Sequence, residues 1–253
     1  MLKVHHLRIG RSIFTVWLLE ELGAPYELEI YNRNEMGRAP PELKQAHPLG
    51  KSPVIEDDGF VLAESGSIAL YLLDKYDPDN RLGPPKNDPR AKAEWMQWLM
   101  YTEASAFAPM LIRLLLSRSE DRPPVFDMFS AGEVALQLGH MEERLTERPY
   151  VMGDRFQAPD IGFSYIAQMA ERLAQAAPKR GGRAVLRLPA GAAGRLAQPA
   201  TRAGARATRM AMRRISLPPP RTGPARRDRS CRRRRNAPES AGRADVPGEP
   251  RAG

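Results

Sequence analysis

Two short apolar runs joined by an acidic turn constrain the fold of this chain most strongly. Residues 53–55 and 60–62 are the apolar runs, and the pair Asp58-Gly59 lies between them. An Asp-Gly pair between apolar runs is typical of a tight turn in a β-hairpin. The apolar residues of 65–76 then recur at helical spacing. The pattern predicts a hairpin that is followed directly by a helix.

The residues before the hairpin predict the rest of an α/β domain. Gly23 follows a strongly helical run, at the position where a left-handed residue commonly ends a helix. The predicted order of elements over residues 1–77 is βαβαββα. The expected elements before the hairpin are a strand over 3–7, a helix over 12–22, a strand over 26–31, and a loop with a short helix over 33–47.

The chain changes character after residue 77. Three prolines and few apolar residues make 78–88 a predicted linker. Beyond it, apolar residues recur at helical spacing, which predicts helices over 91–117, 125–147 and 159–175. Residues 89–175 are therefore expected to form an all-helical domain.

The helical periodicity stops near residue 176, and the charge changes sign there. Residues 176–253 carry 19 Arg and one Lys against four acidic residues, so this tail has a formal charge of +16 and the preceding residues have −7, which together give +9. A segment dominated by Arg, Ala, Pro and Gly cannot bury enough apolar surface to offset its ordering entropy, which predicts disorder. GC-rich codons encode these four residues, so a frameshift near residues 172–179 would also produce such a tail. The nucleotide sequence tests that hypothesis.

Several expected features of other protein classes are absent from the sequence. The lone cysteine, Cys231, lies in the tail, so the body has no disulfide and no cysteine metal site. His5, His6 and His140 have no metal-ligand spacing, so no metal is expected. The N-terminus does not read as a signal peptide, and no apolar run approaches the roughly 18 residues of a membrane span. These absences predict a soluble cytoplasmic protein.

Four segments of the chain carry recognisable motifs, in order and at proper spacing. They are SIFTVWLLEELGAPY (12–26), HPLGKSPVI (47–55), LAESGSIA (62–69) and VMGDRFQAPDI (151–161). Together they resemble the cytosolic glutathione transferase family: the first matches its first helix, the second its NP-x-GK-x-P segment, the third its ES segment and the fourth its GD-x-F segment. The resemblance implies a thioredoxin-like N-terminal domain, a shortened helical domain, glutathione as co-substrate and a homodimer.

The resemblance also implies a glutathione site around the hairpin. It implies a cis bond before Pro53, which would leave the backbone of Val54 free to pair with the cysteinyl part of the ligand, as an added strand does. Glu64 would pair with the γ-glutamyl amine. Ser65, at a helix start, would hold the α-carboxylate, and Lys51 would meet the glycyl carboxylate. Alternatively, Ser65 is only a helix N-cap, and the two charged residues are only solvated.

Catalysis in this family depends on a hydroxyl or a cysteine placed after the first strand. A donor and a helix dipole there raise the thiolate fraction of a thiol whose ordinary pKa is about 8.5. Related bacterial and fungal sequences often read S-R-S-x-R, whereas this chain reads Gly10-Arg11-Ser12-Ile13-Phe14. Ser12 is the predicted catalytic residue, which would make the chain Ser-dependent rather than Cys-dependent. The alternatives are Ser12 as a helix N-cap and the Gly10 N–H as the donor.

The fourth segment departs from the family at one position. Gln157 stands where relatives have Ser or Thr, three residues before Asp160. A hydroxyl and an acidic side chain at this spacing form a capping box at a helix start. The sequence therefore predicts a helix with a weakened cap, at a cost of about 1 kcal/mol.

Three function classes follow from these features. The first is a glutathione S-transferase that transfers glutathione to small electrophiles, as in detoxification. The second is a glutathione-binding carrier or interaction protein with weak catalysis, which the altered residues 10–12 favour. The third is weak, salt-dependent polyanion binding through the arginines at 232–235 of the tail.

Overall fold

The computed structural model describes residues 1–176. The predicted disorder of the tail, the frameshift hypothesis and the arginine cluster at 232–235 concern residues outside this part. The described residues contain every other predicted element and every predicted site residue.

The N-terminal part is built on a four-stranded mixed sheet with the strand order β2-β1-β3-β4. β1 and β2 are parallel because a helix connects them, whereas β3 and β4 form the antiparallel hairpin predicted from the Asp58-Gly59 turn. β1 and β3 are antiparallel neighbours at the centre of the sheet. The seven elements are β1 (Leu2–Leu7), α1 (Ile13–Leu22), β2 (Glu27–Tyr31), α2 (Leu43–Ala46), β3 (Val54–Asp57), β4 (Phe60–Ala63) and α3 (Ser65–Tyr76).

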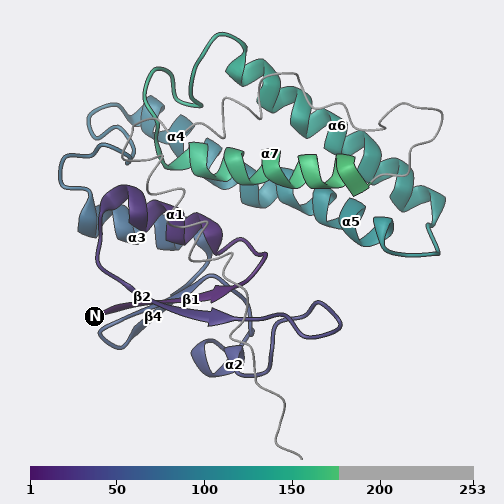
Figure 1. Ribbon diagram of the computed structural model, residues 1–253. Helices are drawn as coiled ribbons and strands as arrows, with labels where there is room; N and C mark the ends of the chain where they lie inside the picture. The colour runs from purple at the N-terminus through teal and green to yellow at the C-terminus, as the bar shows by residue number, and fades with distance from the viewer. Residues whose placement is uncertain (177–253) are drawn as a thin grey trace, which may run out of the picture. The chain divides into compact units, whose positions relative to one another are not determined.

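Helices α1 and α3 pack against each other and cover one face of the sheet, while α2 lies on the other side (Figure 1). Gly23 ends α1 in the left-handed conformation, with a φ of 66°, as its place in the sequence predicted. The order βαβαββα is confirmed, and this arrangement is a thioredoxin-like domain. Its core joins fully buried residues of both layers, namely Val4, Val16, Leu19, Ile55, Ile68 and Leu72.

The second part is helical, as predicted. α7 packs against α4 and α5, and its residues Phe163 and Ile166 are fully buried. They belong to a core that also contains Trp98 and Met110. The elements are α4 (Pro89–Tyr101), the π-helical segment η1 (Thr102–Ala106), α5 (Phe107–Ser117), α6 (Pro124–Thr146) and α7 (Ala158–Ala176).

The π-helical segment is the main difference from the predicted helices, because one continuous helix was expected over 91–117. At η1 the chain meets α7 closely: a Cβ added to Gly162 would lie 2.5 Å from Thr102 Oγ1. A π turn adds one residue to a helical turn and changes which side chains face inward. Here both Thr102 and Ala106 are buried.

A shared apolar core connects the thioredoxin-like domain to the helices. The rings of Trp17 and Phe156 stack at 6.3 Å, and the Ala158 N–H donates to the Leu82 carbonyl at 3.1 Å. Trp17 also belongs to the same buried cluster as Trp95 and Ile161. The start of α7 is thus anchored on α1.

One helical run among residues 1–176, Pro89–Ser117, is long and apolar enough to meet the length and hydropathy criteria for a membrane span. This differs from the sequence prediction, which counted an uninterrupted apolar run. The core helix of a soluble protein passes the same criteria, and Trp95, Trp98 and Leu99 of this run are buried in the two cores described above.

Candidate functional site

The connections that carry the predicted site residues meet at one edge of the sheet. β1 is parallel to β2 and antiparallel to β3, and β3 is antiparallel to β4. The C-terminal ends of β1, β2 and β4 therefore lie at the same edge as the N-terminal end of β3. Residues 8–12, 51–53 and 64–65 belong to the connections at this edge.

The segment before β3 enters the sheet through a cis peptide bond between Ser52 and Pro53, as predicted. Val54 does not lie as predicted. It is fully buried, and it is paired with His5 on one side and with Ala63 on the other. Both edges of Val54 thus face neighbouring strands, which leaves no free edge for a peptide ligand.

Ser52, rather than Val54, has the free backbone that was predicted to pair with a peptide ligand. Its Oγ donates to the His5 carbonyl at 2.7 Å and accepts from the Leu7 N–H at 3.1 Å. The side chain thus extends the β1–β3 pairing, while the backbone of Ser52 makes no backbone hydrogen bond within residues 1–176. The main chain of Ser52 is available to an added strand.

Helix α3 begins at Ser65 with its N-terminus uncapped. Glu64 precedes it with a φ of 72°, and no side chain caps the helix. A positive φ is uncommon for a residue other than glycine, and such strained positions concentrate at functional sites. The first backbone N–H with a described acceptor is that of Ile68, which donates to the Glu64 carbonyl at 2.9 Å. Ser65 is largely buried but is no N-cap, because it lies inside the helix.

The two charged residues of the predicted site are exposed. Neither Lys51 nor Glu64 has an ion pair with any residue of the described chain. Both charges therefore remain available to a ligand. No observation here assigns a ligand group to either of them, so their roles stay predictions.

Ser12 precedes α1, but its hydroxyl faces the interior. The residue is fully buried, and its Oγ donates to the Leu7 carbonyl at 3.4 Å. The side chain makes no N-cap hydrogen bond. This geometry favours neither the predicted catalytic hydroxyl nor the N-cap alternative. The backbone N–H groups of residues 10–12 have no acceptor among residues 1–176.

Arg33 holds the loop between β1 and α1 in place. Its guanidinium donates to the Arg8 carbonyl at 3.1 Å and to the Ile9 carbonyl at 2.8 Å. Ile9 has a φ of 56°, an unusual backbone conformation for a β-branched residue. A Cβ at Gly10 would lie 2.9 Å from the Leu7 carbonyl oxygen, so this loop path requires glycine at position 10.

Several residues that contact this loop were missed by sequence reasoning. Arg11 forms an ion pair with Glu103 of η1 at 2.5 Å, and its guanidinium lies 4.5 Å from the ring centre of Phe107. Arg33, Glu103 and Phe107 lie outside the four family-like segments, and Ser52 occupies a variable position of the second one. Their contacts join positions far apart in the chain, so no local pattern could have revealed them.

Two histidines lie on β1 near the site. Burial and, to a smaller extent, the neighbouring Arg8 lower the pKa of His6 to about 4, against a backbone hydrogen bond with Ser12 that raises it. His6 is therefore neutral at physiological pH. No group of His, Cys, Asp and Glu residues within 1–176 is arranged to hold a metal ion.

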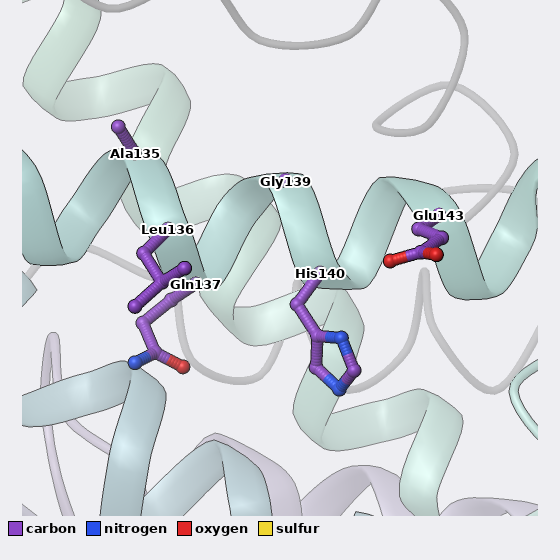
Figure 2. Close-up of a pocket in the computed structure, with 6 residues that line it drawn as sticks. All are labelled: Ala135, Leu136, Gln137, Gly139, His140 and Glu143. Carbon is purple, nitrogen blue, oxygen red and sulfur yellow. The ribbon is translucent and has the colours of Figure 1, made fainter.

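A surface hollow of about 560 Å³ lies along α6 (Figure 2). Its lining residues all belong to that helix, and Figure 2 shows Gln137 and His140 extending from the same side of it. The His140 ring stacks on Trp98 at 5.1 Å, and the Tyr101 hydroxyl donates to the Gln137 carbonyl at 3.0 Å. The hollow shares no residue with the sheet-edge site.

Comparison with known proteins matches both the N-terminal domain and most of the chain to glutathione S-transferases. The sequence model of the glutathione S-transferase N-terminal domain matches residues 2–74. Glutathione S-transferase 3 of Schizosaccharomyces pombe is 32% identical over 190 residues, which cover 69% of this chain and 77% of that protein. Glutathione S-transferase 1 of Saccharomyces cerevisiae is 32% identical over 200 residues, which cover 71% of this chain and 85% of that protein.

Solved structures agree with these matches. A glutathione S-transferase from Actinobacillus pleuropneumoniae superimposes with a TM-score of 0.67 at 31% identity, covering 83% of this chain and 93% of that one. A glutathione transferase homolog from Lodderomyces elongisporus, solved with two GSH per subunit, gives a TM-score of 0.65 at 17% identity, covering 83% of this chain and 98% of that one. The second likeness supports the fold alone.

The four-stranded sheet with its helices defines a thioredoxin-like domain, and a helical region follows it. With relatives at 32% identity that are matched over 77% and 85% of their length, the chain belongs to the glutathione S-transferase family.

Proposed function

We propose that this chain binds glutathione at the sheet edge and transfers it to small electrophilic substrates. One observation carries the proposal: the backbone N–H groups at the start of α3 and those of residues 10–12, just before α1, have no acceptor within residues 1–176, and they lie at the same edge beside exposed charges without an ion-pair partner. Helix N-termini bind anions, and glutathione brings two carboxylates and a thiolate. Residues 1–77 form the glutathione-binding domain in this proposal, 78–88 the linker and 89–175 the helical domain.

Each part of glutathione finds a matching group at this edge. The N–H groups at the start of α3, together with the Ser65 hydroxyl, receive the α-carboxylate, and Glu64 receives the γ-glutamyl amine. The main chain of Ser52 pairs with the cysteinyl part, and Pro53 fixes the direction in which that main chain enters the sheet. Lys51 attracts the glycyl carboxylate. Burial of Val54 supports the strand but makes no ligand contact.

The thiolate is stabilised by backbone rather than by a side chain in this proposal. The N–H groups of residues 10–12 lie at the positive end of α1 and are free in the described structure. Such donors lower the pKa of a thiol and so raise its nucleophilic fraction. The thiolate then attacks the electrophilic carbon, and the leaving group departs with its electron pair.

Substitution of Ser12 separates the hydroxyl from the backbone as donor. We expect Ser12→Ala to keep kcat for chlorodinitrobenzene within about twofold, because removal of a true transition-state donor typically costs about 100-fold or more. Ser117→Ala is the matched control, since Ser117 Oγ also donates to a backbone carbonyl, at 2.7 Å from the Leu114 oxygen. A 100-fold loss confined to Ser12→Ala would make the hydroxyl the donor.

The burial of Ser12 also favours a second candidate, a glutathione-binding carrier with weak catalysis. Binding to immobilised glutathione and turnover of chlorodinitrobenzene distinguish the two. Retention with turnover supports the transferase, and retention without turnover supports the carrier. Absence of retention would exclude both.

We further propose a cytoplasmic homodimer that acts in detoxification. Exposed apolar side chains on β4 (Phe60 and Val61) and near the start of α6 (Phe126 and Phe129) supply surface for subunit contact. Light scattering on the full chain tests this assembly. Polyanion binding by the tail concerns residues outside the described structure, and a mobility-shift comparison with and without residues 176–253 tests it.

A further inference from the structure

A cluster of charged and aromatic side chains lies where the loop after β1 meets the helical part. Arg11 pairs with Glu103 at 2.5 Å and lies over the Phe107 ring at 4.5 Å. The Phe107 ring lies 6.2 Å from the ring of Tyr165 on α7. The four side chains thus form a continuous chain of contacts from the thioredoxin-like domain to α7, and the first of them is one residue from Gly10.

Tyr165 is surrounded by positive charge. Burial raises the pKa of its phenol, while the guanidinium groups of Arg11, Arg172 and Arg33 lower it and the carboxylate of Glu103 raises it. The residue is partly buried, and its hydroxyl makes no hydrogen bond with a described residue. It is a polar group without a polar partner in the described structure, and its ring contacts Phe107, over which the guanidinium of Arg11 lies.

The positive charge of this cluster is not neutralised within residues 1–176. Among the described residues, Arg33 donates only to backbone carbonyls. Burial lowers the pKa of its guanidinium, Tyr165 raises it, and Arg118 lowers it. Arg118 and Arg172 are exposed and have no ion pair with a described carboxylate. Glu103 is already paired with Arg11. Like charges repel, and an anion placed among these guanidinium groups would offset that repulsion.

The proposed glutathione carboxylates do not account for this cluster. One is assigned to the start of α3 and the other to Lys51, and both lie on the connections around β3 and β4. The cluster lies beside the loop of residues 8–12, on the side of the proposed thiolate that faces the helical part. A second, separate anion therefore matches it, and the rings of Phe107 and Tyr165 offer an apolar surface to the same molecule.

We propose that the acceptor side of this enzyme takes an electrophile that carries a carboxylate next to an aromatic ring. The ring packs against Phe107 and Tyr165, the carboxylate accepts from Arg172 and from the Tyr165 hydroxyl, and Arg33 and Arg118 supply further positive potential. This assignment rests on the proposed transferase function. It names the substrate class, which the family relationship leaves open.

A chloronitrobenzoate illustrates the balance of the reaction. The glutathione thiolate, whose proton has passed to water, adds to the ring carbon that bears chlorine and forms a carbon–sulfur bond. The carbon–chlorine bond then breaks, and chloride leaves with the electron pair. The carboxylate remains unchanged, so its contacts contribute to binding and orientation only.

Binding without turnover is the first test. By titration calorimetry on the full chain, we expect nitrobenzoate to bind at least about tenfold tighter than neutral nitrobenzamide, as expected for a charge-assisted hydrogen bond. Arg172→Gln should remove most of that preference. Arg90→Gln, which alters an exposed arginine at the start of α4, should leave it intact. The tail is present in every variant, so its charge does not distinguish them.

Kinetics with glutathione provide the second test. We compare kcat/KM for chloronitrobenzoate and chloronitrobenzamide, each divided by its uncatalysed rate with glutathione. The acid-to-amide ratio should fall by about tenfold in Arg172→Gln and stay unchanged in Arg90→Gln. Equal binding of acid and amide, or an equal effect of the two arginine variants, would overturn the proposal. A rise in the KM for glutathione alone would assign the cations to glutathione instead.

The two proposals fail separately. S-methylglutathione is titrated in its own experiment, and absence of binding there would overturn the proposed glutathione site. The preference for nitrobenzoate over nitrobenzamide is measured without glutathione. Its loss would overturn the acceptor assignment while leaving glutathione binding in place.

Discussion

The start of α4 in the helical part differs from the starts of α1 and α3 in the thioredoxin-like domain in how the backbone N–H groups are used. At α4, Pro89 has no N–H, the Asp88 carboxylate accepts from Arg90 and Ala91 at 2.9 and 3.0 Å, and the Asp88 carbonyl accepts from Lys92 at 2.9 Å. Every N–H of that first turn is satisfied.

The starts of α1 and α3 have no such cap. No side chain bonds to either one, although Ser12 and Glu64 stand beside them. At α1 the Ile13 and Phe14 N–H groups donate to the Gly10 and Arg11 carbonyls, whereas the N–H groups of residues 65–67 and 10–12 have no acceptor within residues 1–176. A protein usually satisfies such groups, because a capping side chain contributes about 1 kcal/mol. The difference indicates that α4 uses a polar residue to stabilise its start, whereas the thioredoxin-like domain leaves donors at residues 10–12 and 65–67 free for a ligand that brings its own anions.

The largest expected effect tests the structural side of this comparison. The Asp160 carboxylate is buried and accepts from the Val151 and Gln157 N–H groups, both at 2.8 Å. Asp160→Ala leaves two buried donors unsatisfied, so we expect it to lower the free energy of unfolding by about 3 to 5 kcal/mol. Urea unfolding measures this. A loss below about 1 kcal/mol would show that α7 does not depend on this carboxylate.

The same carboxylate gives a pH dependence of defined sign. Burial raises the pKa of Asp160 to about 6, against backbone hydrogen bonds from Val151 and Gln157 that lower it. An unfolded Asp has a pKa of about 3.9, so between about pH 4 and pH 6 the folded state binds more protons. The free energy of unfolding should therefore fall by about 2 kcal/mol as pH rises through this window, relative to Asp160→Asn. Equal pH profiles for the two proteins would contradict the raised pKa.

Glu64 tests the ligand side of the comparison. Because the carboxylate is exposed and unpaired in the described structure, Glu64→Gln should leave the free energy of unfolding within about 0.5 kcal/mol of the parent. It should weaken binding of S-methylglutathione by about tenfold, through loss of a charge-assisted contact with the amine. Glu120→Gln, in the exposed connection before α6, is the control and should change neither quantity. Unchanged binding of S-methylglutathione by Glu64→Gln would mean that Glu64 is only a solvated surface charge with no role in binding.

The smallest expected effect restores a missing cap. Gln157 Oε1 is buried without a hydrogen-bond partner in the described structure, in agreement with the weakened cap predicted from the sequence. Gln157→Thr should complete the capping box with Asp160 and raise the free energy of unfolding by about 1 kcal/mol. Gln157→Ala removes the unsatisfied oxygen without adding a hydroxyl. Equal gains from both variants would mean that the cap itself contributes nothing.

Local patterns predicted the elements well because each depends on neighbouring residues. The Asp58-Gly59 turn, Gly23 as the end of α1, and the helical spacing of apolar residues beyond 89 all appear in the structure as expected. The π turn at Thr102–Ala106 was not predicted, since it depends on how closely Gly162 of a distant helix approaches.

The site was predicted in part. Motif spacing identified the connections that meet at the sheet edge, and it identified Glu64 and Ser65 at the start of α3. It assigned the free backbone to Val54 instead of Ser52, because only the register of the central strand shows which residue keeps an unpaired edge. It also could not show that the Ser12 hydroxyl faces the interior.

The sequence by itself determined the order of elements, the family and the segments that approach the ligand, since these follow from periodicity and motif spacing along the chain. The tertiary structure alone decided which groups in those segments are free. Whether an N–H, a hydroxyl or a guanidinium is free depends on partners brought close by folding, as Leu7 is to Ser12 and Glu103 is to Arg11. Hydrogen bonds and ion pairs act over a few ångströms in space. The number of residues between two groups along the chain does not predict how far apart they lie in the folded protein.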